Sequence, residues 1–143
     1  MSSRDAIANL VYTYAERIDA GDFEGTAALF AHATFGQASG AVRRGAAEVL
    51  AAFRAAVRVH DGSPRTKHVT TNLIVDVDET AGTATARSYF TVFQQTGTLA
   101  LQPILAGRYH DRFERADGAW RFTERRISLD LVGDLREHVP SRA

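Results

Sequence analysis

Asp19, His68 and Tyr14 are the residues of this sequence whose types best suit acid–base chemistry. A carboxylate beside an imidazole can hold one ring tautomer, while the other ring nitrogen moves a proton near neutral pH. A tyrosine hydroxyl can donate a hydrogen bond to a carbonyl or enolate oxygen. Each residue also has a plain structural interpretation: a solvated carboxylate, a structural histidine and a core aromatic. The predicted helix and strand that carry these residues help to decide between the functional and the structural interpretation.

Tyr14 and Asp19 lie on a helix predicted over residues 4–20. Apolar residues recur there at helical spacing and form one buried stripe, with Tyr14 in its middle. Asp19 falls in the last turn, where the helix dipole disfavours a negative charge by about 0.3–1 kcal/mol. It lies at the edge of the stripe, so it points either toward a pocket or into solvent beside the turn at Gly21.

His68 lies on a strand predicted over residues 66–77, rich in Thr and Val. Alternation divides this strand into one face that begins polar and one apolar face. The first holds His68, Thr70, Asn72, Ile74 and Asp76, and the second holds Val69, Leu73, Val75 and Val77. The polar face either meets solvent, as is common in antiparallel sheets, or lines a wet cavity.

The remaining elements predict an α+β fold. Helices are expected over residues 23–30 and 46–59, with a short strand at 34–35 inside a less regular segment. Further strands are expected over 83–95, 99–115 and 120–131, with a hairpin signal at Asp117-Gly118. Three helices before a four-strand antiparallel meander must cover one sheet face. A strongly curved, mostly antiparallel sheet closed by these helices encloses a pocket in a single domain over residues 1–132, and residues 133–143 form a polar tail.

An apolar pocket wall requires large side chains on these elements, and the sequence offers several candidates. They are Phe30, Phe35, Phe53, Phe90, Val92, Leu105, Tyr109 and Trp120. The alternative for each is core packing, and only a few can line a cavity. The histidines other than His68 show no metal-ligand spacing, so no metal is expected. Five arginines of the last two strands are predicted to lie on a solvent-exposed sheet face and to pair with Asp111 and two glutamates. The alternative is that Arg125 or Arg126 faces the pocket.

Composition restricts the partners. Lys and Arg together number 17 and so do Asp and Glu, so the formal net charge is zero, which argues against nucleic-acid binding. The sequence has no cysteine, which excludes disulfides and a thiolate nucleophile, and it has no long apolar run that would cross a membrane. A cytoplasmic protein is expected. Apolar residues on the outer sheet face, Tyr89 and Phe93 among them, predict a homodimer or homotrimer.

Several short motifs occur together in this order along the chain. They are Tyr14-Ala15-x-x-Ile18-Asp19, Gly21-Asp22-Phe23, Lys67-His68-Val69-Thr70-Thr71-Asn72, Gly107-Arg108-Tyr109-His110-Asp111 and Asp117-Gly118-Ala119-Trp120-Arg121-Phe122. In this order they resemble the SnoaL-like branch of the nuclear-transport-factor-2-like superfamily over residues 5–131. The resemblance implies a cone-shaped α+β barrel.

The set Tyr14, Asp19 and His68 is most similar to that of scytalone dehydratase and bile-acid 7α-dehydratase. By this resemblance His68 removes a proton α to a carbonyl, Asp19 holds the imidazole, and Tyr14 binds the developing enolate, with no metal or organic cofactor. The dehydratases carry a further His or Asp on the next strand, where this chain has only Thr91 and Gln94 as polar residues. Asn72, Gln94 and Arg125 join the apolar wall as expected substrate-binding residues.

The sequence therefore predicts a cofactor-independent lyase or isomerase, of the dehydratase type. Its expected partner is a small hydrophobic, carbonyl-bearing ring compound, similar to a polyketide or a steroid. Two alternatives use the same pocket: a non-catalytic ligand-binding or accessory-subunit domain, and a polyketide cyclase or hydrolase.

Overall fold

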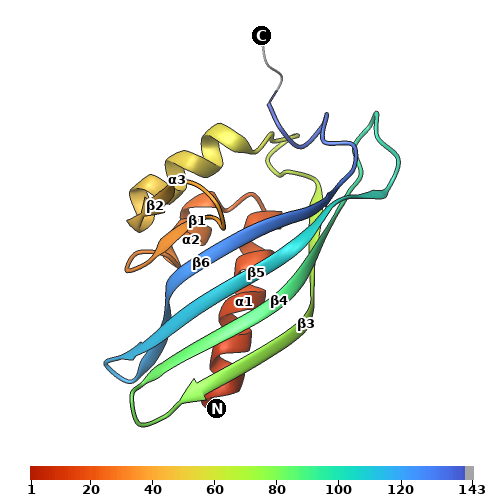
Figure 1. Ribbon diagram of the computed structural model, residues 1–143. Coiled ribbons are helices and arrows are strands. Elements are labelled where there is room, and N and C mark those ends of the chain that lie inside the picture. The colour runs from red at the N-terminus through yellow and green to blue at the C-terminus, as the bar shows by residue number, and fades with distance from the viewer. Residues whose placement is uncertain (141–143) are drawn as a thin grey trace.

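The computed structural model describes residues 1–140 and shows three helices packed on a six-stranded sheet (Figure 1). The helices are α1 (Ser3–Asp19), α2 (Phe23–Ala28) and α3 (Gly45–Ala56). The strands are β1 (Thr34–Gln37), β2 (Val42–Arg44), β3 (Thr66–Asp78), β4 (Thr83–Gln94), β5 (Gln102–Ala116) and β6 (Ala119–Val132). The predicted α+β fold class is confirmed. The long elements lie within a few residues of their predicted bounds, because each has a regular apolar periodicity.

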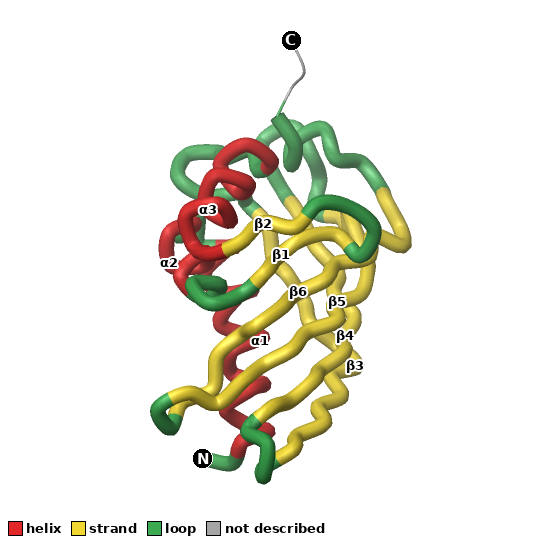
Figure 2. Tube along the Cα trace, turned by 60° about the vertical axis from the view of Figure 1, so that its left-hand side comes forward, coloured by secondary structure: helices red, strands yellow, loops and turns green. Residues whose placement is uncertain are grey.

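The strands lie in the order β2-β1-β6-β5-β4-β3. β1 runs parallel to β6, and the other neighbouring pairs are antiparallel. The predicted meander is β3 to β6, and the two short strands extend the sheet beside β6. β2 and β3 form the edges of the described sheet, so it does not close on itself, and the helices lie on one side of it (Figure 2).

Helix α1 places the candidate tyrosine and aspartate. Its buried residues are Ile7, Ala8, Val11, Tyr14 and Ile18. The helix ends at Asp19, and Gly21 then takes a positive φ of 79°. A Cβ at Gly21 would lie 2.3 Å from the carbonyl oxygen of Gly62, so only glycine permits this close approach. The approach brings the loop that precedes β3 against the end of α1.

Strand β3 contains a β-bulge that changes which side chains face the helices. Asn72 has a φ of 53°, and the register with β4 shifts between Thr71 and Ile74. Before the bulge His68 and Thr70 face inward, and after it the inward residues are Leu73, Val75 and Val77, while Ile74 is 45% exposed. The predicted division into one polar and one apolar face is therefore corrected: the inner face is polar at its start and apolar beyond the bulge.

One end of the sheet carries the start of β3, where His68 lies, and three further segments meet there. The loops 57–65 and 95–101 and the C-terminal residues 133–140 gather there, opposite the hairpin turns (Figure 1). The backbone N–H of Gly133 donates to Ile104 O at 2.8 Å, and that of Arg58 donates to His138 O at 2.8 Å. The first part of the predicted tail thus packs on the domain, and residues 141–143 lie outside the described residues.

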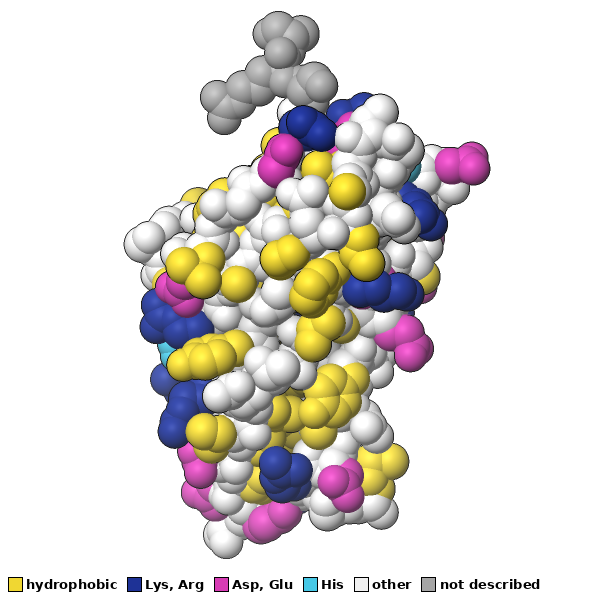
Figure 3. All heavy atoms as spheres, turned by 90° about the vertical axis from the view of Figure 1, so that its right-hand side faces the viewer, with side chains coloured by type: hydrophobic (Ala, Val, Ile, Leu, Met, Phe, Trp, Pro, Cys, Tyr) yellow, Lys and Arg dark blue, Asp and Glu magenta, His cyan; other side chains and the backbone are white. Residues whose placement is uncertain are grey.

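The outer face of the sheet exposes apolar side chains. Val69, Ile74 and Tyr89 are 42%, 45% and 53% exposed. Hydrophobic side chains are interspersed with charged ones over the side of the molecule where β3 forms the edge (Figure 3). No helix within residues 1–140 is long and apolar enough to cross a membrane.

Candidate functional site

Asp19 and His68 form a direct pair, here called the dyad, at the end of the sheet where β3 begins. The His68 Nδ1 atom lies 2.6 Å from Asp19 Oδ1, and the backbone N–H of His68 donates to Asp19 Oδ2 at 2.8 Å. The hydroxyl of Thr66 donates to Asp19 Oδ1 at 2.8 Å. These three bonds compensate the unfavourable position of a carboxylate at a helix C-terminus. They also fix the carboxylate relative to the start of β3.

The charges of this pair suit proton transfer. Burial acts to raise the pKa of Asp19, but the hydrogen bonds and charge of His68, together with Thr66, outweigh it and lower the pKa. An ionised carboxylate only accepts hydrogen bonds, so His68 Nδ1 carries the proton and Nε2 remains the basic atom. The side chains of His68 and Asp19 keep 10% and 8% exposure, so the pair is nearly but not wholly enclosed.

Tyr14 lies beside the imidazole as a neutral hydrogen-bond donor. Its ring centroid is 6.4 Å from that of His68, with the two planes nearly perpendicular. Burial raises the pKa of Tyr14 to about 12, although the charge of Arg125 opposes the rise. The phenol therefore keeps its proton near neutral pH, as a group that stabilises an enolate oxygen must.

Arg125 and Asp111 form a second ion pair under the tyrosines. The guanidinium binds the carboxylate with two bonds of 2.8 and 2.9 Å, and both side chains are fully buried. The guanidinium carbon lies 3.6 Å from the ring centroid of Tyr109 and 4.4 Å from that of Tyr14. The expected solvated role of Asp111 is thus corrected. Arg125 faces inward, whereas Arg126 is partly exposed and donates to Gln37 O.

The predicted apolar wall is largely assembled around Tyr14. Phe30, Phe35, Phe53 and Tyr109 place their ring centroids 5.9–6.4 Å from that of Tyr14. Phe90 stacks on Tyr109 with centroids 4.3 Å apart. Val92 and Gln94 are buried on the same strand, and Leu105 is half-buried on the next. These side chains pack closely, so most of them form a core rather than an empty space.

A cavity of about 490 Å³ lies beside this aromatic group. Its lining includes Phe35, Phe53, Leu105, Ile127, Leu135 and His138. Phe35 and Phe53 form a wall shared with Tyr14, but Tyr14, Asp19 and His68 do not themselves line the cavity. A ligand seated there would lie next to the dyad without touching it in this conformation.

Comparison with known proteins places this arrangement in a family. Residues 1–126 match the model of the SnoaL-like domain. The chain belongs to the SnoaL-like domain family. Membership of this family supports a related catalytic or ligand-binding role for the chain. No curated protein matches the sequence.

Solved structures share the fold of this SnoaL-like domain. Rv3472 from Mycobacterium tuberculosis, a protein of unknown function, is 30% identical with a TM-score of 0.72, and the match covers 89% of this chain and 71% of that one. A protein assigned as a scytalone dehydratase from Novosphingobium aromaticivorans is 23% identical, with a TM-score of 0.71 and coverage of 92% and 86%. ActVI-ORFA from Streptomyces coelicolor is 20% identical, with a TM-score of 0.71 and coverage of 89% and 96%.

Two expected binding residues of this SnoaL-like domain lie away from the cavity and from the side chains around Tyr14. Asn72 is exposed at the bulge of β3, on the wrong side of its strand to meet a ligand. Trp120 lies near the hairpin at the opposite end of the sheet, under the guanidinium of Arg115 at 5.2 Å. The expectation for Asn72 assumed unbroken alternation along β3, and that for Trp120 assumed that every large aromatic side chain lines the pocket. Neither expectation took account of where the residue lies along its strand.

Sequence reasoning also missed residues that the SnoaL-like domain places at this end. Thr66 holds Asp19, and His138 lines the cavity from the C-terminal segment. Thr66 could have been found, because it shares the inward parity of His68 two residues later. His138 gave no such signal, because a polar segment without periodicity does not indicate what its side chains contact.

Proposed function

We propose that this chain is a cofactor-independent lyase or isomerase of the dehydratase type, acting on a hydrophobic, carbonyl-bearing ring compound similar to a polyketide or a steroid. The Asp19–His68 contact of 2.6 Å carries the proposal, because it leaves one imidazole nitrogen basic and fixes the ring. A solved structure that is named as a scytalone dehydratase has the same fold, so this fold can hold the kind of pocket that the proposed chemistry needs.

The proposed reaction is loss of water from a β-hydroxy ketone. His68 Nε2 removes the proton α to the carbonyl, and Asp19 stabilises the imidazolium that forms. Tyr14 donates a hydrogen bond to the enolate oxygen as its charge develops. The imidazolium then returns the proton to the β-hydroxyl, the carbon–oxygen bond breaks, and water and the conjugated ketone leave. In the isomerase variant the same proton returns to carbon.

The surroundings favour an apolar, flat substrate. The cavity of about 490 Å³ lies within the range of small-molecule sites, about 300–1,000 Å³. Its walls include Phe35 and Phe53, whose rings can pack on a planar ring system. A ligand must shift at least one of the shared side chains to reach His68, because the dyad is outside the cavity lining.

Turnover of a panel of ring β-hydroxy ketones tests the proposal. Water loss extends conjugation, so ultraviolet absorbance and a mass change report the product. We expect turnover by the unaltered chain and a loss of at least about 10²-fold in His68→Gln, the effect of removing a general base. His110→Gln, an exposed histidine of β5, is the matched control and should keep full activity.

A non-catalytic ligand-binding domain is the second candidate, favoured by the separation of cavity and dyad. In that case the unaltered chain binds ring ketones without converting any of them, and His68→Gln binds them equally well. Binding measured by isothermal calorimetry alongside turnover separates the two candidates.

We also propose that the chain assembles as a homodimer or homotrimer through the outer sheet face, where Tyr89 is half exposed. Sedimentation equilibrium of the unaltered chain and of Tyr89→Arg tests this. A monomer at micromolar concentration would contradict it.

A further inference from the structure

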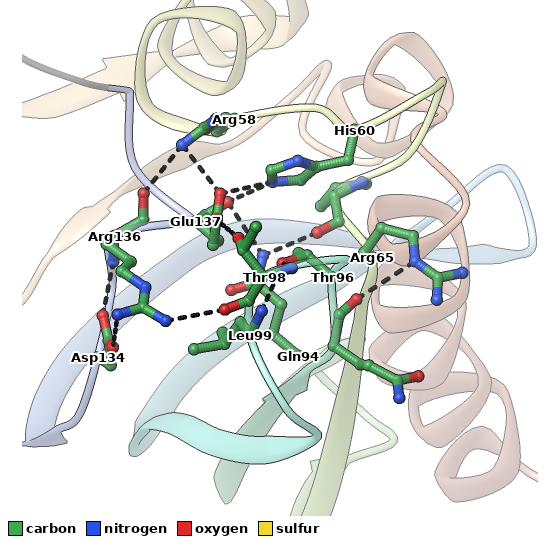
Figure 4. Close-up of polar contacts among 12 residues, drawn as sticks. Arg58, His60, Arg65, Gln94, Thr96, Thr98, Leu99, Asp134, Arg136 and Glu137 are labelled. Atoms are coloured by element: carbon green, nitrogen blue, oxygen red, sulfur yellow. Dashed lines mark hydrogen bonds and ion pairs between the residues drawn. The ribbon is translucent and has the colours of Figure 1, made fainter.

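Residues 133–140, here called the C-terminal strap, cross the end of the sheet that carries the dyad. The strap begins where the Gly133 N–H donates to Ile104 O. Further along, Arg136 Nη2 donates to the carbonyl oxygen of Thr98 at 2.9 Å. Figure 4 shows the polar groups of the strap meeting those of the loops 57–65 and 95–101. The strap therefore has a defined place over this end of the molecule.

Glu137 anchors the middle of the strap through both its side chain and its backbone. Its carboxylate pairs with Arg58 Nη1 at 2.9 Å and accepts a hydrogen bond from the hydroxyl of Thr98. Its carbonyl oxygen accepts from His60 Nε2 at 2.6 Å and from Gln94 Nε2 at 3.1 Å. Figure 4 shows these groups converging from three segments. The residue that follows Glu137 is consequently held in position by its neighbour.

His138 is that residue, and its imidazole keeps a hydrogen-bonding capacity that the described protein leaves unused. Its backbone N–H donates to Leu135 O at 2.9 Å, and its carbonyl oxygen accepts from the N–H of Arg58. The residue lines the cavity of about 490 Å³. Its Nδ1 atom is buried without a hydrogen-bond partner within residues 1–140. Buried polar atoms are nearly always paired, so such an atom indicates a partner outside the described residues, and a bound ligand is one such partner.

The strap brings His138 to the same end of the sheet as the dyad. Gln94, which donates to Glu137 O, is the cross-strand partner of Thr66. Thr66 in turn donates to Asp19. The cavity that His138 lines is thus connected to the dyad by a short series of contacts, although the dyad does not line that cavity.

The imidazole of His138 is neutral at physiological pH. Burial lowers its pKa to about 4, the neighbouring His68 adds to the lowering when it is protonated, and Asp19 acts in the opposite direction. A neutral imidazole offers one donor and one acceptor nitrogen. Because Nδ1 is buried in this structure, a turn of the ring about its Cβ–Cγ bond would be needed to present that atom to a ligand in the cavity, and such a turn leaves the anchored backbone in place.

We propose that His138 is a ligand-positioning residue, whose imidazole hydrogen-bonds the hydroxyl of a ring compound seated in the cavity and turns that end of the ligand toward His68. This inference rests on the proposed function for its ligand class. On strand β4 the only polar residues at the expected position are Thr91 and Gln94, and neither is an acid or a base. His138 would supply the additional polar group from the strap instead.

A matched pair of ligands tests the role of His138. β-Hydroxytetralone (3-hydroxy-1-tetralone) and α-tetralone differ only in the hydroxyl. Because the proposed reaction would consume the first of them, calorimetry measures the affinity of each for His68→Gln and for the double variant His68→Gln with His138→Phe. We expect His68→Gln to prefer the hydroxyl-bearing ligand by about fivefold to tenfold, the effect of one hydrogen bond. The preference should disappear in the double variant. Val139→Ala in the same His68→Gln background, which also changes the cavity lining, should alter both affinities alike and keep the preference.

Two further variants keep the test decisive if His138→Phe does not fold. His138→Asn keeps a polar group at the Nδ1 position and His138→Gln keeps one at the Nε2 position, so the one that retains the preference identifies the nitrogen used. A preference that survives in His138→Phe, or in both polar variants where His138→Phe does not fold, overturns the role of His138. The absence of any preference in the protein that keeps His138 overturns it as well. Binding with the expected preference but without formation of naphthol from β-hydroxytetralone by the unaltered chain overturns the proposed catalysis alone, and no binding of either ligand overturns both.

Discussion

Two carboxylates each bind a basic side chain on the inner side of the same sheet, and the surroundings of the two pairs differ. Asp19 and His68 lie at the end of the sheet, with side chains that keep 8% and 10% exposure. Asp111 and Arg125 lie further along it, and their side chains are fully enclosed. Burial acts against the charge of Arg125, but Asp111 outweighs it and raises the pKa further, so this pair does not exchange protons near neutral pH.

The comparison separates a structural pair from a chemical one. An arginine bound by two hydrogen bonds and packed between Tyr14 and Tyr109 holds β5, β6 and α1 together. A histidine bound at one nitrogen leaves the other available for the proton transfer that we propose. Two carboxylate pairs on one sheet can thus have different roles. The role depends on whether the basic side chain keeps a nitrogen that can accept a proton, and on whether a ligand can reach that nitrogen.

Replacing Asp19 by Asn should give the largest change. Asn offers an amide N–H as well as an oxygen, so it no longer selects the His68 tautomer with a basic Nε2. We expect turnover to fall by about 10³–10⁴-fold, which corresponds to about 4–5.5 kcal/mol in the activation free energy. The free energy of unfolding should change by no more than about 1–2 kcal/mol, because the amide oxygen still accepts a hydrogen bond.

Urea denaturation and steady-state turnover of Asp19→Asn, measured on the same preparation, check both parts. A loss of activity that merely follows a loss of folded protein would contradict the division between the two pairs.

Replacing Asp111 by Asn should give the next largest change, now in stability. The variant leaves the guanidinium of Arg125 buried without its charge partner, which costs about 3–5 kcal/mol in the free energy of unfolding. Urea denaturation measures this loss. The double variant Asp111→Leu with Arg125→Met removes both charges, and we expect it to recover much of the stability. A cost below about 1 kcal/mol for Asp111→Asn would show that the pair is not structural.

Much of the fold could be predicted from the sequence, because long elements with strong periodicity need little tertiary information. The stripe of α1 is one such signal, and the strand patterns around the Asp117-Gly118 turn are another. The turn takes positive φ values of 52° and 78°, as its residue types predict. The contact between Asp19 and His68 was expected from the ordered motifs, which resemble a known family.

The remaining features depend on irregularities that alternation does not show. The bulge at Asn72 reverses the inward parity of β3, and a second shift between Arg112 and Phe113 breaks the pairing of β5 with β6. Alternation on β5 places Asp111 inward together with Tyr109 and Phe113. The shift reverses the parity of β6 after Phe122, so alternation could not show that Arg125 points inward to meet it. The strap is polar and irregular, so only tertiary contacts place His138.

His138 should make stability pH-dependent in a way that distinguishes it from the dyad. Its folded pKa of about 4 lies below the ordinary value of 6.5, so the unfolded chain takes up a proton first as the pH falls. Stability is therefore unaffected by this group above pH ~6.5 and is lost between about 6.5 and 4. The groups that act on it are His68, Asp19 and His60. Asp19 has a lowered pKa, so its own contribution is present above its unfolded pKa and is lost only in stronger acid.

Urea denaturation of the unaltered chain and of His138→Gln, at pH values between about 7.5 and 4, isolates this effect. We expect the unaltered chain to lose about 2–3 kcal/mol more than the variant. Parallel curves for the two proteins would show that the imidazole is not buried as a neutral group.

The exposed pair of Arg108 and Asp130 should give the smallest change and gives the sharpest control. It joins the same two strands as Asp111 and Arg125, and it has the same two-bond geometry, with distances of 2.8 and 3.0 Å. Its side chains are 46% and 39% exposed, so water and salt screen the attraction. Asp130→Asn should leave the midpoint of urea denaturation almost unchanged, and any small effect should shrink further at high salt. A cost equal to that of Asp111→Asn would mean that pairing itself, rather than the burial of an unpaired charge, determines the stability contributed by the inner pair.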